Sequence, residues 1–192
     1  MEDNDIRIQL YDFNTTKVLW EEINIISDTL CLIRQKFQFR KRVIIKYYET
    51  KKAVEGELNI AIPEWVKAFS INNYIGVINM NEWKENDNIK KILIHEFTHC
   101  AMRAICKKEE IPLWVDEGIA MYMAHQIEQT YLETEKLLEI TSSETILDNI
   151  YVYASDLMNR LVSKIGIETL IKLLKNERSF FWDLQVLKKA ML

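Results

Sequence analysis

Two of the chain's three histidines stand four residues apart, in the pentapeptide HEFTH at residues 95–99. On an α-helix, positions i and i+4 lie one turn apart on the same face, so both imidazoles can reach one ion. Imidazole nitrogen binds Zn²⁺ at about 2.0–2.1 Å. Glu96 follows His95 directly and would lie beside the open coordination position, where it could take a proton from water. The spacing predicts a metal site at His95 and His99 with Glu96 as general base; the alternative is a chance pair of histidines beside a solvated carboxylate.

A third protein ligand is needed if one position on the zinc is to stay open for water. The segment PLWVDEGIAMY at residues 112–122 offers one, because Pro112 and the preceding residues allow the chain to reverse before a second helix begins. Glu117 would then face back toward the histidines, and Gly118 would let the second helix approach the first closely. The third histidine, His125, is two turns beyond Glu117 and about 80° round that helix, so we expect it at the surface.

The order HEFTH and then PLWVDEGIAMY resembles the gluzincin metallopeptidases, specifically the peptidase-MA-like group with the pattern HExxH followed by PxWxxEGxAxY. The matching motifs lie in residues 95–122. The resemblance implies one zinc ion per chain, held by His95, His99 and Glu117. It also implies hydrolysis of peptide bonds in a peptide or protein substrate, with Glu96 as the general base.

A further part of the family pattern places a tyrosine at the start of a later helix. The sequence YVYA at residues 151–154, with Leu161 and Gly166, fits this pattern. The resemblance implies that Tyr151, with Tyr153 as the fallback, donates a hydrogen bond to the oxyanion of the tetrahedral intermediate. Both tyrosines fit equally well as amphipathic core residues with their hydroxyls at the surface.

The sequence departs from the family in two respects. Thermolysin-like gluzincins carry an aspartate four residues after the ligand glutamate, where this chain has Met121. The group that orients the ligand histidines is therefore left open among Asp116, Glu109, Glu110 and a backbone oxygen. None of the extended motifs that bind a free substrate amino terminus is present, so an endopeptidase is expected rather than an aminopeptidase.

Length, charge and composition describe one ordinary domain. With 192 residues and 48% hydrophobic content, we expect a single domain over 1–192, with an α/β part at about 1–107 and a helical part at about 112–192. The net charge of −4, with both signs interspersed, predicts no nucleic-acid partner and no membrane binding. An acidic amino terminus and the lack of a long apolar run predict a cytoplasmic protein. The three cysteines are expected to be reduced thiols.

Periodicity predicts a sheet followed by helices. The fold class implied is α+β, a zincin-like single domain with a small twisted, mostly antiparallel sheet packed on a helix-rich remainder. The predicted strands are Ile6–Tyr11, Val43–Tyr48, Leu58–Ile62 and Ile75–Met80. The predicted helices, besides those of the two motifs, are Thr16–Phe37, Ala124–Leu138, Tyr151–Lys164, Ile167–Lys175 and Phe181–Met191.

The strand Ile75–Met80 precedes the HEFTH helix and has two interpretations. The family resemblance makes it an exposed sheet edge that pairs with an extended substrate. It fits equally well as a buried strand with a bulge at Gly76.

The main alternative to an enzyme is a non-catalytic, zinc-stabilised protein that binds a peptide or a partner, and the intact Glu96 argues against it. Hydrolysis of an amide bond in a small molecule is a further alternative, because the chemistry of a site does not fix its substrate. The sequence does not indicate how many copies of the chain associate.

Overall fold

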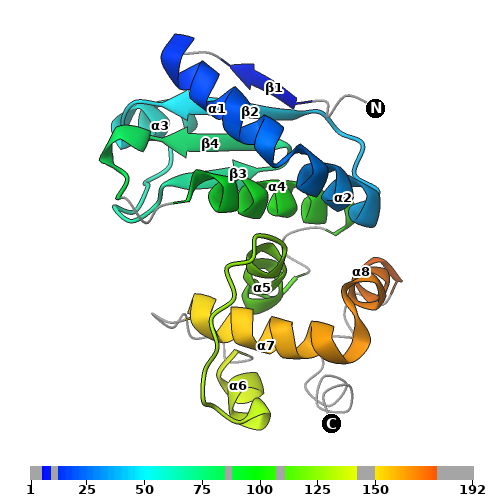
Figure 1. The fold of residues 1–192 in the computed structure, drawn as a ribbon. Helices are drawn as coiled ribbons and strands as arrows, with labels where there is room; N and C mark the ends of the chain where they lie inside the picture. The colour runs from blue at the N-terminus through cyan, green and yellow to red at the C-terminus, as the bar shows by residue number, and fades with distance from the viewer. Residues whose placement is uncertain (1–5, 10–12, 85–87, 107–110, 142–149, 177–192) are drawn as a thin grey trace. The chain divides into compact units, whose positions relative to one another are not determined.

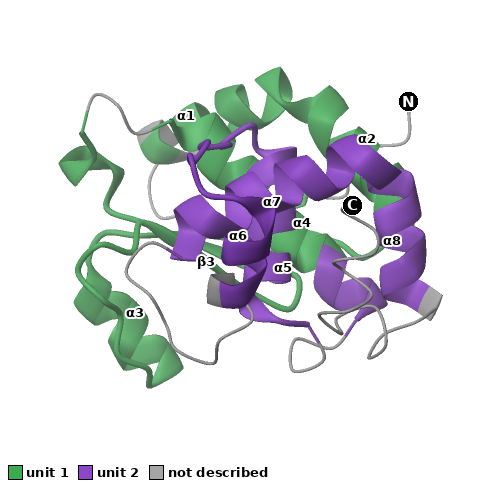
Figure 2. Ribbon diagram, turned by 90° about the horizontal axis from the view of Figure 1, so that it is seen from below, with its two compact units in different colours: residues 1–101 green, residues 102–192 purple. Residues whose placement is uncertain are grey.

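The computed structural model describes residues 6–9, 13–84, 88–106, 111–141 and 150–176. The chain divides into two units, Met1–Ala101 and Met102–Leu192, which are coloured separately in Figure 2. The division falls inside a helix, α4 (Ile89–Ile105). It does not test the prediction of a single domain over 1–192.

The first unit is built on a four-stranded mixed sheet (Figure 1). Its strands are β1 (Ile6–Gln9), β2 (Val43–Tyr48), β3 (Ala68–Ile71) and β4 (Tyr74–Ile78), in the order β1-β2-β4-β3. The pairs β1–β2 and β2–β4 are parallel, whereas β3–β4 is antiparallel. The α+β class is confirmed. The prediction of a mostly antiparallel sheet is wrong, because helices rather than tight turns connect β1 to β2 and follow β2.

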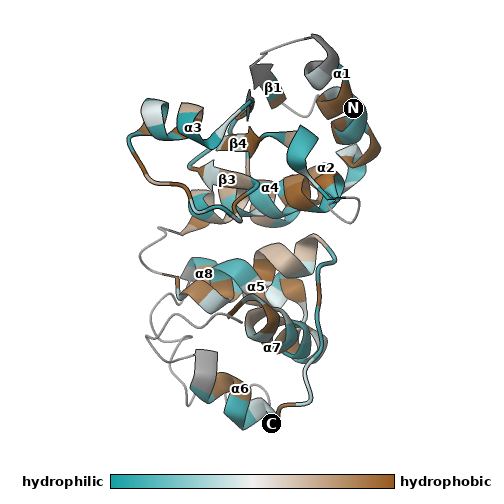
Figure 3. Ribbon diagram, turned by 90° about the vertical axis from the view of Figure 1, so that its left-hand side faces the viewer, coloured by the Kyte–Doolittle hydropathy of each residue, from teal (hydrophilic) through white to brown (hydrophobic). Residues whose placement is uncertain are grey.

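Three helices of the first unit lie on one face of the sheet and a fourth lies on the other (Figures 1 and 3). On the first face are α1 (Phe13–Ile25), α2 (Ser27–Phe37) and α4, and on the other is α3 (Lys51–Leu58). A short 3₁₀ turn, η1 (Met80–Glu82), follows β4.

The predicted helix Thr16–Phe37 is two helices. Ile26 leaves helical geometry, with a ψ of 7°, although its N–H still donates to the Glu22 carbonyl at 3.2 Å. Asp28 then stands in the first turn of α2, where a carboxylate interacts favourably with the helix dipole. The apolar positions still face the core on both sides of the break; they are Leu19, Ile23, Ile26, Leu30, Ile33 and Phe37.

The predicted strand Leu58–Ile62 is wrong. Thr50 caps the start of α3 by accepting a hydrogen bond from the Ala53 N–H, and Asn59 ends the helix in a left-handed conformation with φ of 52°. Leu58 is therefore the last residue of a helix, and the chain from 59 to 63 is irregular. The period-2 pattern that suggested a strand belongs to this helix end and to an exposed coil.

β3 is a strand that was not predicted from the sequence, and it forms a hairpin with β4. A two-residue turn, Asn72-Asn73, connects them, with Asn72 at a φ of 56° that asparagine tolerates well. Because β3 lies outside β4, the strand predicted at Ile75–Met80 is an interior strand and not an exposed edge.

Gly76 of β4 lies opposite an aromatic ring and does not form a bulge. Its cross-strand partner is Phe69, and a Cβ placed on Gly76 would come within 2.3 Å of two atoms of the Phe69 ring. The register through Gly76 is regular on both sides, toward Lys46 and toward Phe69. The glycine is there because the neighbouring ring occupies the space of its side chain.

Over its described residues the second unit contains helices and no strands. Besides the end of α4 it contains α5 (Leu113–Met123), α6 (Thr134–Thr141), α7 (Ile150–Ile165) and α8 (Ile167–Asn176). The predictions for the last two are confirmed, with Gly166 between them at a φ of 78°. The helix predicted at Phe181–Met191 lies outside the described residues.

The predicted helix Ala124–Leu138 is wrong over its first two thirds, because α5 ends at Met123 and α6 begins only at Thr134. His125 takes a left-handed conformation with φ of 52°, its N–H donates to the Tyr122 carbonyl at 3.2 Å, and the N–H of Gln126 donates to the Met121 carbonyl at 2.9 Å. These two bonds form a Schellman motif, which ends a helix. Only α6 matches part of the predicted range.

α5 and α7 pack closely through Gly118. A Cβ on this glycine would lie 2.8 Å from the Ala154 carbonyl oxygen and 2.9 Å from Cβ of Met158. The missing side chain therefore lets α5 approach α7, whereas the sequence predicted a close approach to the histidine helix.

The loop that follows α5 is attached to α7 by a buried carboxylate. Oδ2 of Asp156 accepts hydrogen bonds from the N–H and the hydroxyl of Thr130, at 2.9 and 2.6 Å. Arg160 donates to both carboxylate oxygens, at 3.0 and 2.9 Å. Burial by itself would raise the pKa of the Asp156 carboxyl, but the bonds from Arg160 and Thr130 outweigh it and lower that pKa below its usual value.

Two further sequence expectations concern the described part of the chain. All three cysteines lie in it, and all are free thiols. Among the helices described, none combines the length and the apolar character that crossing a bilayer requires.

Two glycine substitutions should change stability in opposite directions. Gly118→Ala places a methyl group against the backbone of α7, and we expect it to destabilise the protein by about 1–3 kcal/mol. Gly56→Ala is the matched control, because nothing beyond its chain neighbours and the backbone of its own helix lies within 4 Å of its Cβ position in α3, and we expect it to stabilise by about 0.5–1 kcal/mol. Urea unfolding measures both; equal effects of the two variants would contradict the packing described for Gly118.

Asp156→Asn should destabilise the protein at neutral pH by about 1–3 kcal/mol, because the charged hydrogen-bond acceptor is lost. The folded-state pKa of Asp156 lies below its unfolded value, so its stabilisation is present above about pH 4 and is lost as pH falls through the folded-state pKa. The difference between wild type and variant should therefore shrink in acid. Glu139→Gln, which removes an exposed pair with Lys136, is the control and should have little effect. A pH-independent difference would contradict this assignment.

Candidate metal centre

The HEFTH segment lies in the middle of α4, as its spacing predicted. Asn88 begins this helix, because its side-chain oxygen accepts from the Lys91 N–H at 3.2 Å and its carbonyl accepts from the Ile92 N–H at 3.0 Å. His95 and His99 then lie one turn apart. Their Nε2 atoms are 3.1 Å apart, and their rings meet edge to face with centroids 4.8 Å apart.

The opposite side of α4 is anchored in the core of the first unit. Phe97, two residues from each histidine and thus about 200° round the helix, is buried and packs edge to face on Phe39, with ring centroids 5.7 Å apart. The Arg34 guanidinium lies 5.1 and 5.2 Å from the centroids of these two rings. Arg34 also donates to the carbonyls of Phe39 and Lys41, at 3.2 and 2.9 Å. This packing fixes the rotation of α4 and so the direction of the histidine face.

A third potential ligand completes the group. His95, His99 and Glu117 each offer one ligand atom, and these atoms all lie within 4.8 Å of one another. His99 is buried, and the other two side chains are half-buried. The group could hold a metal ion.

The donor set and the spacing fit zinc. Two imidazole nitrogens on a tetrahedral zinc, each at about 2.0–2.1 Å, are about 3.3–3.4 Å apart. The observed separation of 3.1 Å is close to this value. Two histidines and one carboxylate leave a fourth tetrahedral position for water, as catalytic zinc sites do.

Glu117 reaches this group from the second helix that the sequence predicted. α5 begins after Pro112, whose carbonyl accepts from the N–H groups of Val115 and Asp116 at 2.9 and 3.1 Å. Trp114 is buried, and Asp116 is only 5% exposed.

The other candidate residues do not belong to this group of ligand atoms in the described structure. His125 is exposed, as expected, and is not part of this group of ligand atoms. Glu96 is half-buried, Tyr151 is exposed at the start of α7, and Tyr153 is half-buried. The catalytic roles of these three residues stay predictions, and Glu109 and Glu110 lie outside the described residues.

Sequence reasoning missed the residues that hold the histidine helix in place. Arg34 and Phe39 lie far from α4 in sequence, in the last turn of α2 and just after it. The one available signal was a basic residue near a helix end, which is commonplace on helices without any such contact.

Comparisons with protein-family models, with curated proteins and with solved structures found no match to this chain. The pattern in residues 95–122 therefore stays a resemblance of motifs. The case for a metal centre rests on the residues themselves and on the distances between their ligand atoms.

Proposed function

We propose that this chain is a zinc-dependent peptidase of the gluzincin type, with a zincin-like fold. The observation that carries the proposal is the grouping of His95, His99 and Glu117, with one ligand atom of each within 4.8 Å of the others. The two Nε2 atoms 3.1 Å apart make the grouping specific, because they can approach one cation together.

In this proposal His95, His99 and Glu117 hold one zinc ion. Bound zinc supplies a Lewis acid that polarises the scissile carbonyl and lowers the pKa of water from about 15.7 toward 7. Glu96, beside His95, accepts a proton from the attacking water and passes it to the leaving amine. A half-buried position suits this role, because the carboxylate keeps access to solvent.

Helix geometry favours Tyr151 over Tyr153 as the oxyanion donor. Ala154 and Met158 mark the side of α7 that packs on α5 at Gly118. Tyr151 precedes them by three and seven residues and so shares that side, whereas Tyr153 is turned by about 200° from Tyr151. The phenol of Tyr151 is therefore the better candidate to approach the helix that carries Glu117.

The proposed substrate is a peptide or protein in extended form, and the cleavage is internal. The strand that would pair with it is β3 and not β4, because β3 ends the strand order of the described sheet. An edge strand offers main-chain groups to which an extended peptide can add. β3 has the sequence AFSI, without the lysine or proline that commonly blocks such pairing.

The metal content of single-residue variants tests the proposed ligands. Purified protein should contain one zinc per chain, and His95→Ala, His99→Ala and Glu117→Ala should each lose most of it while keeping the helical circular dichroism spectrum. His125→Ala is the matched control, because His125 is exposed and outside the group, and it should keep its zinc. Undiminished zinc in Glu117→Ala, measured by elemental analysis, would remove this residue from the site.

The general base is tested by Glu96→Gln, which is nearly isosteric but cannot accept a proton at neutral pH. We expect zinc to stay bound while the rate of cleavage of a dye-labelled casein falls by about 10²–10⁴. Glu135→Gln, an exposed charge change on α6, should cleave at the wild-type rate. Wild-type cleavage by Glu96→Gln would refute the role of this residue. Zinc-loaded wild-type protein that binds peptides without cleaving them would favour a non-catalytic binding protein.

A further inference from the structure

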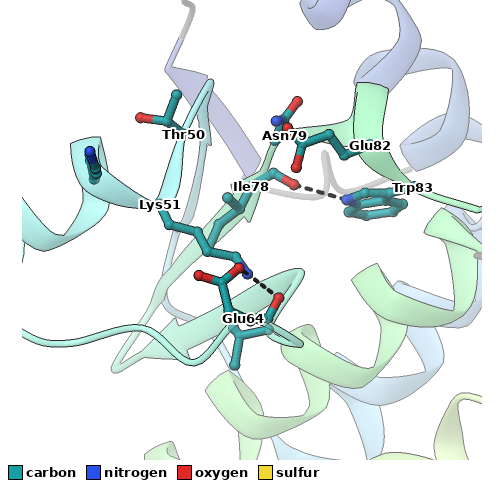
Figure 4. Close-up of a pocket in the computed structure, with 9 residues that line it drawn as sticks. Thr50, Lys51, Glu64, Ile78, Asn79, Glu82 and Trp83 are labelled. Atoms are coloured by element: carbon teal, nitrogen blue, oxygen red, sulfur yellow. Dashed lines mark hydrogen bonds and ion pairs between the residues drawn. The ribbon is translucent and has the colours of Figure 1, made fainter.

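A second candidate site lies in the first unit, apart from the histidine helix. A hollow of about 370 Å³ opens beside the residues that follow β2 and β4 (Figure 4). These are the carboxyl ends of two adjacent parallel strands, the edge of an open α/β sheet where ligands commonly bind. The volume is at the lower end of the range of roughly 300–1,000 Å³ for small-molecule pockets.

One wall of the hollow is a fixed aromatic ring. The indole N–H of Trp83 donates to the Ile78 carbonyl at 2.8 Å, which holds the ring in place beside the end of β4. Ile78 is buried and Val66 is half-buried, and both line the hollow. This apolar surface suits a hydrophobic group of a ligand.

The charged residues of the lining come from different elements and carry both signs. Lys51 is held by the loop before β3, because its ammonium donates to the Glu64 carboxylate at 3.0 Å and to the Glu64 carbonyl. Lys52, from the first turn of α3, and Glu82, from η1, are exposed and form no ion pair with any residue of the described structure.

Both lysines of this lining lie at the amino terminus of a helix, where a positive charge is unfavourable. Lys51 and Lys52 open α3, and its first turn has no acidic residue. Cations at a helix start are opposed by the helix dipole. Glu64 offsets the charge of Lys51. A carboxylate from a ligand would offset the charge of Lys52 in the same way.

We propose that this hollow binds a small zwitterion, an amino acid or dipeptide with an apolar side chain. The ligand carboxylate lies toward Lys52, its ammonium lies toward Glu82, and its side chain packs on Trp83. The net charge of the four charged lining residues is zero, because two lysines balance two glutamates, and this matches a ligand with one charge of each sign. The site does not depend on the proposed peptidase activity.

Nuclear magnetic resonance of the Trp83 indole N–H tests the proposal at the site itself. The resonance is assigned by its loss in Trp83→Phe, and the full chain is then titrated with L-phenylalanine. We expect a saturable shift. N-acetylphenylalanine, which lacks the ammonium, and phenylalanine amide, which lacks the carboxylate, should each bind more weakly, by up to about fivefold for one exposed charge pair.

Charge variants identify which end of the ligand each residue binds. Glu82→Gln should lower the affinity for phenylalanine to that of N-acetylphenylalanine and leave the affinity for N-acetylphenylalanine unchanged. Lys52→Gln should lower the affinity for phenylalanine to that of phenylalanine amide and leave the affinity for the amide unchanged. Glu49→Gln and Lys41→Gln make the same charge changes at exposed positions outside the lining and should have no effect.

Three results would overturn the proposal. The first is a Trp83 resonance that phenylalanine does not shift, or equal affinity for phenylalanine and both blocked analogues. The second is a response to inorganic phosphate alone, which would make the hollow an anion site. The third is loss of the response in His95→Ala, which would assign the binding to the metal centre. A retained response in that variant supports a separate site.

Discussion

Two imidazole nitrogens held 3.1 Å apart on one helix face are the constraint on which the candidate centre depends. At this distance the two rings must share something between them, either a proton donated by one ring to the other or a cation bound by both. A shared proton satisfies only these two groups. A shared cation also uses the third ligand, Glu117, whose carboxylate belongs to the same group of ligand atoms. The proposed zinc therefore uses an arrangement that the helix spacing already imposes.

The direction of the histidine face of α4 is set by packing contacts of residues that have no part in metal binding or catalysis. Phe97 lies between the histidines in sequence but about 200° away on the helix, and it is fixed by Phe39 and by the Arg34 guanidinium. A cation over an aromatic face is worth about 0.5–2 kcal/mol, and here one guanidinium serves two rings and two carbonyls. Residues of the first unit thus hold the histidine helix on the side opposite the histidines. In the sequence these residues are only an arginine and two phenylalanines, and nothing there indicates that they contact one another.

Local patterns in the sequence predicted the elements that carry the centre, and tertiary contacts decided the rest. The spacing of HEFTH, the segment with Glu117 and the apolar periodicity of α7 and α8 act within single helices, so they were readable. The direction of β2 relative to β4 depends on pairing between segments far apart in the sequence. The pairing of β3 with β4 is local, and its signal in the sequence is the Asn72-Asn73 turn. The conformations of single residues could not be predicted from periodicity either. Ile26 breaks a helix without glycine or proline, and His125 ends a helix in a left-handed conformation.

The buried polar residues separate the scaffold from the candidate centre. In the described structure they are Thr98, His99, Asp116, Ser155 and Asp156. Thr98 and Ser155 donate to carbonyls of their own helices, at 2.8 and 3.0 Å, and Asp156 fastens a loop to α7. His99 and Asp116 are also buried, and both lie in the motif segments, His99 four residues after His95 and Asp116 next to Glu117. Burying a polar group costs free energy unless it is paired, and in the proposed centre the zinc ion would be a partner for His99. Asp116 is one of the groups that the sequence leaves open for orienting a ligand histidine, and its burial beside Glu117 keeps it a candidate for that role.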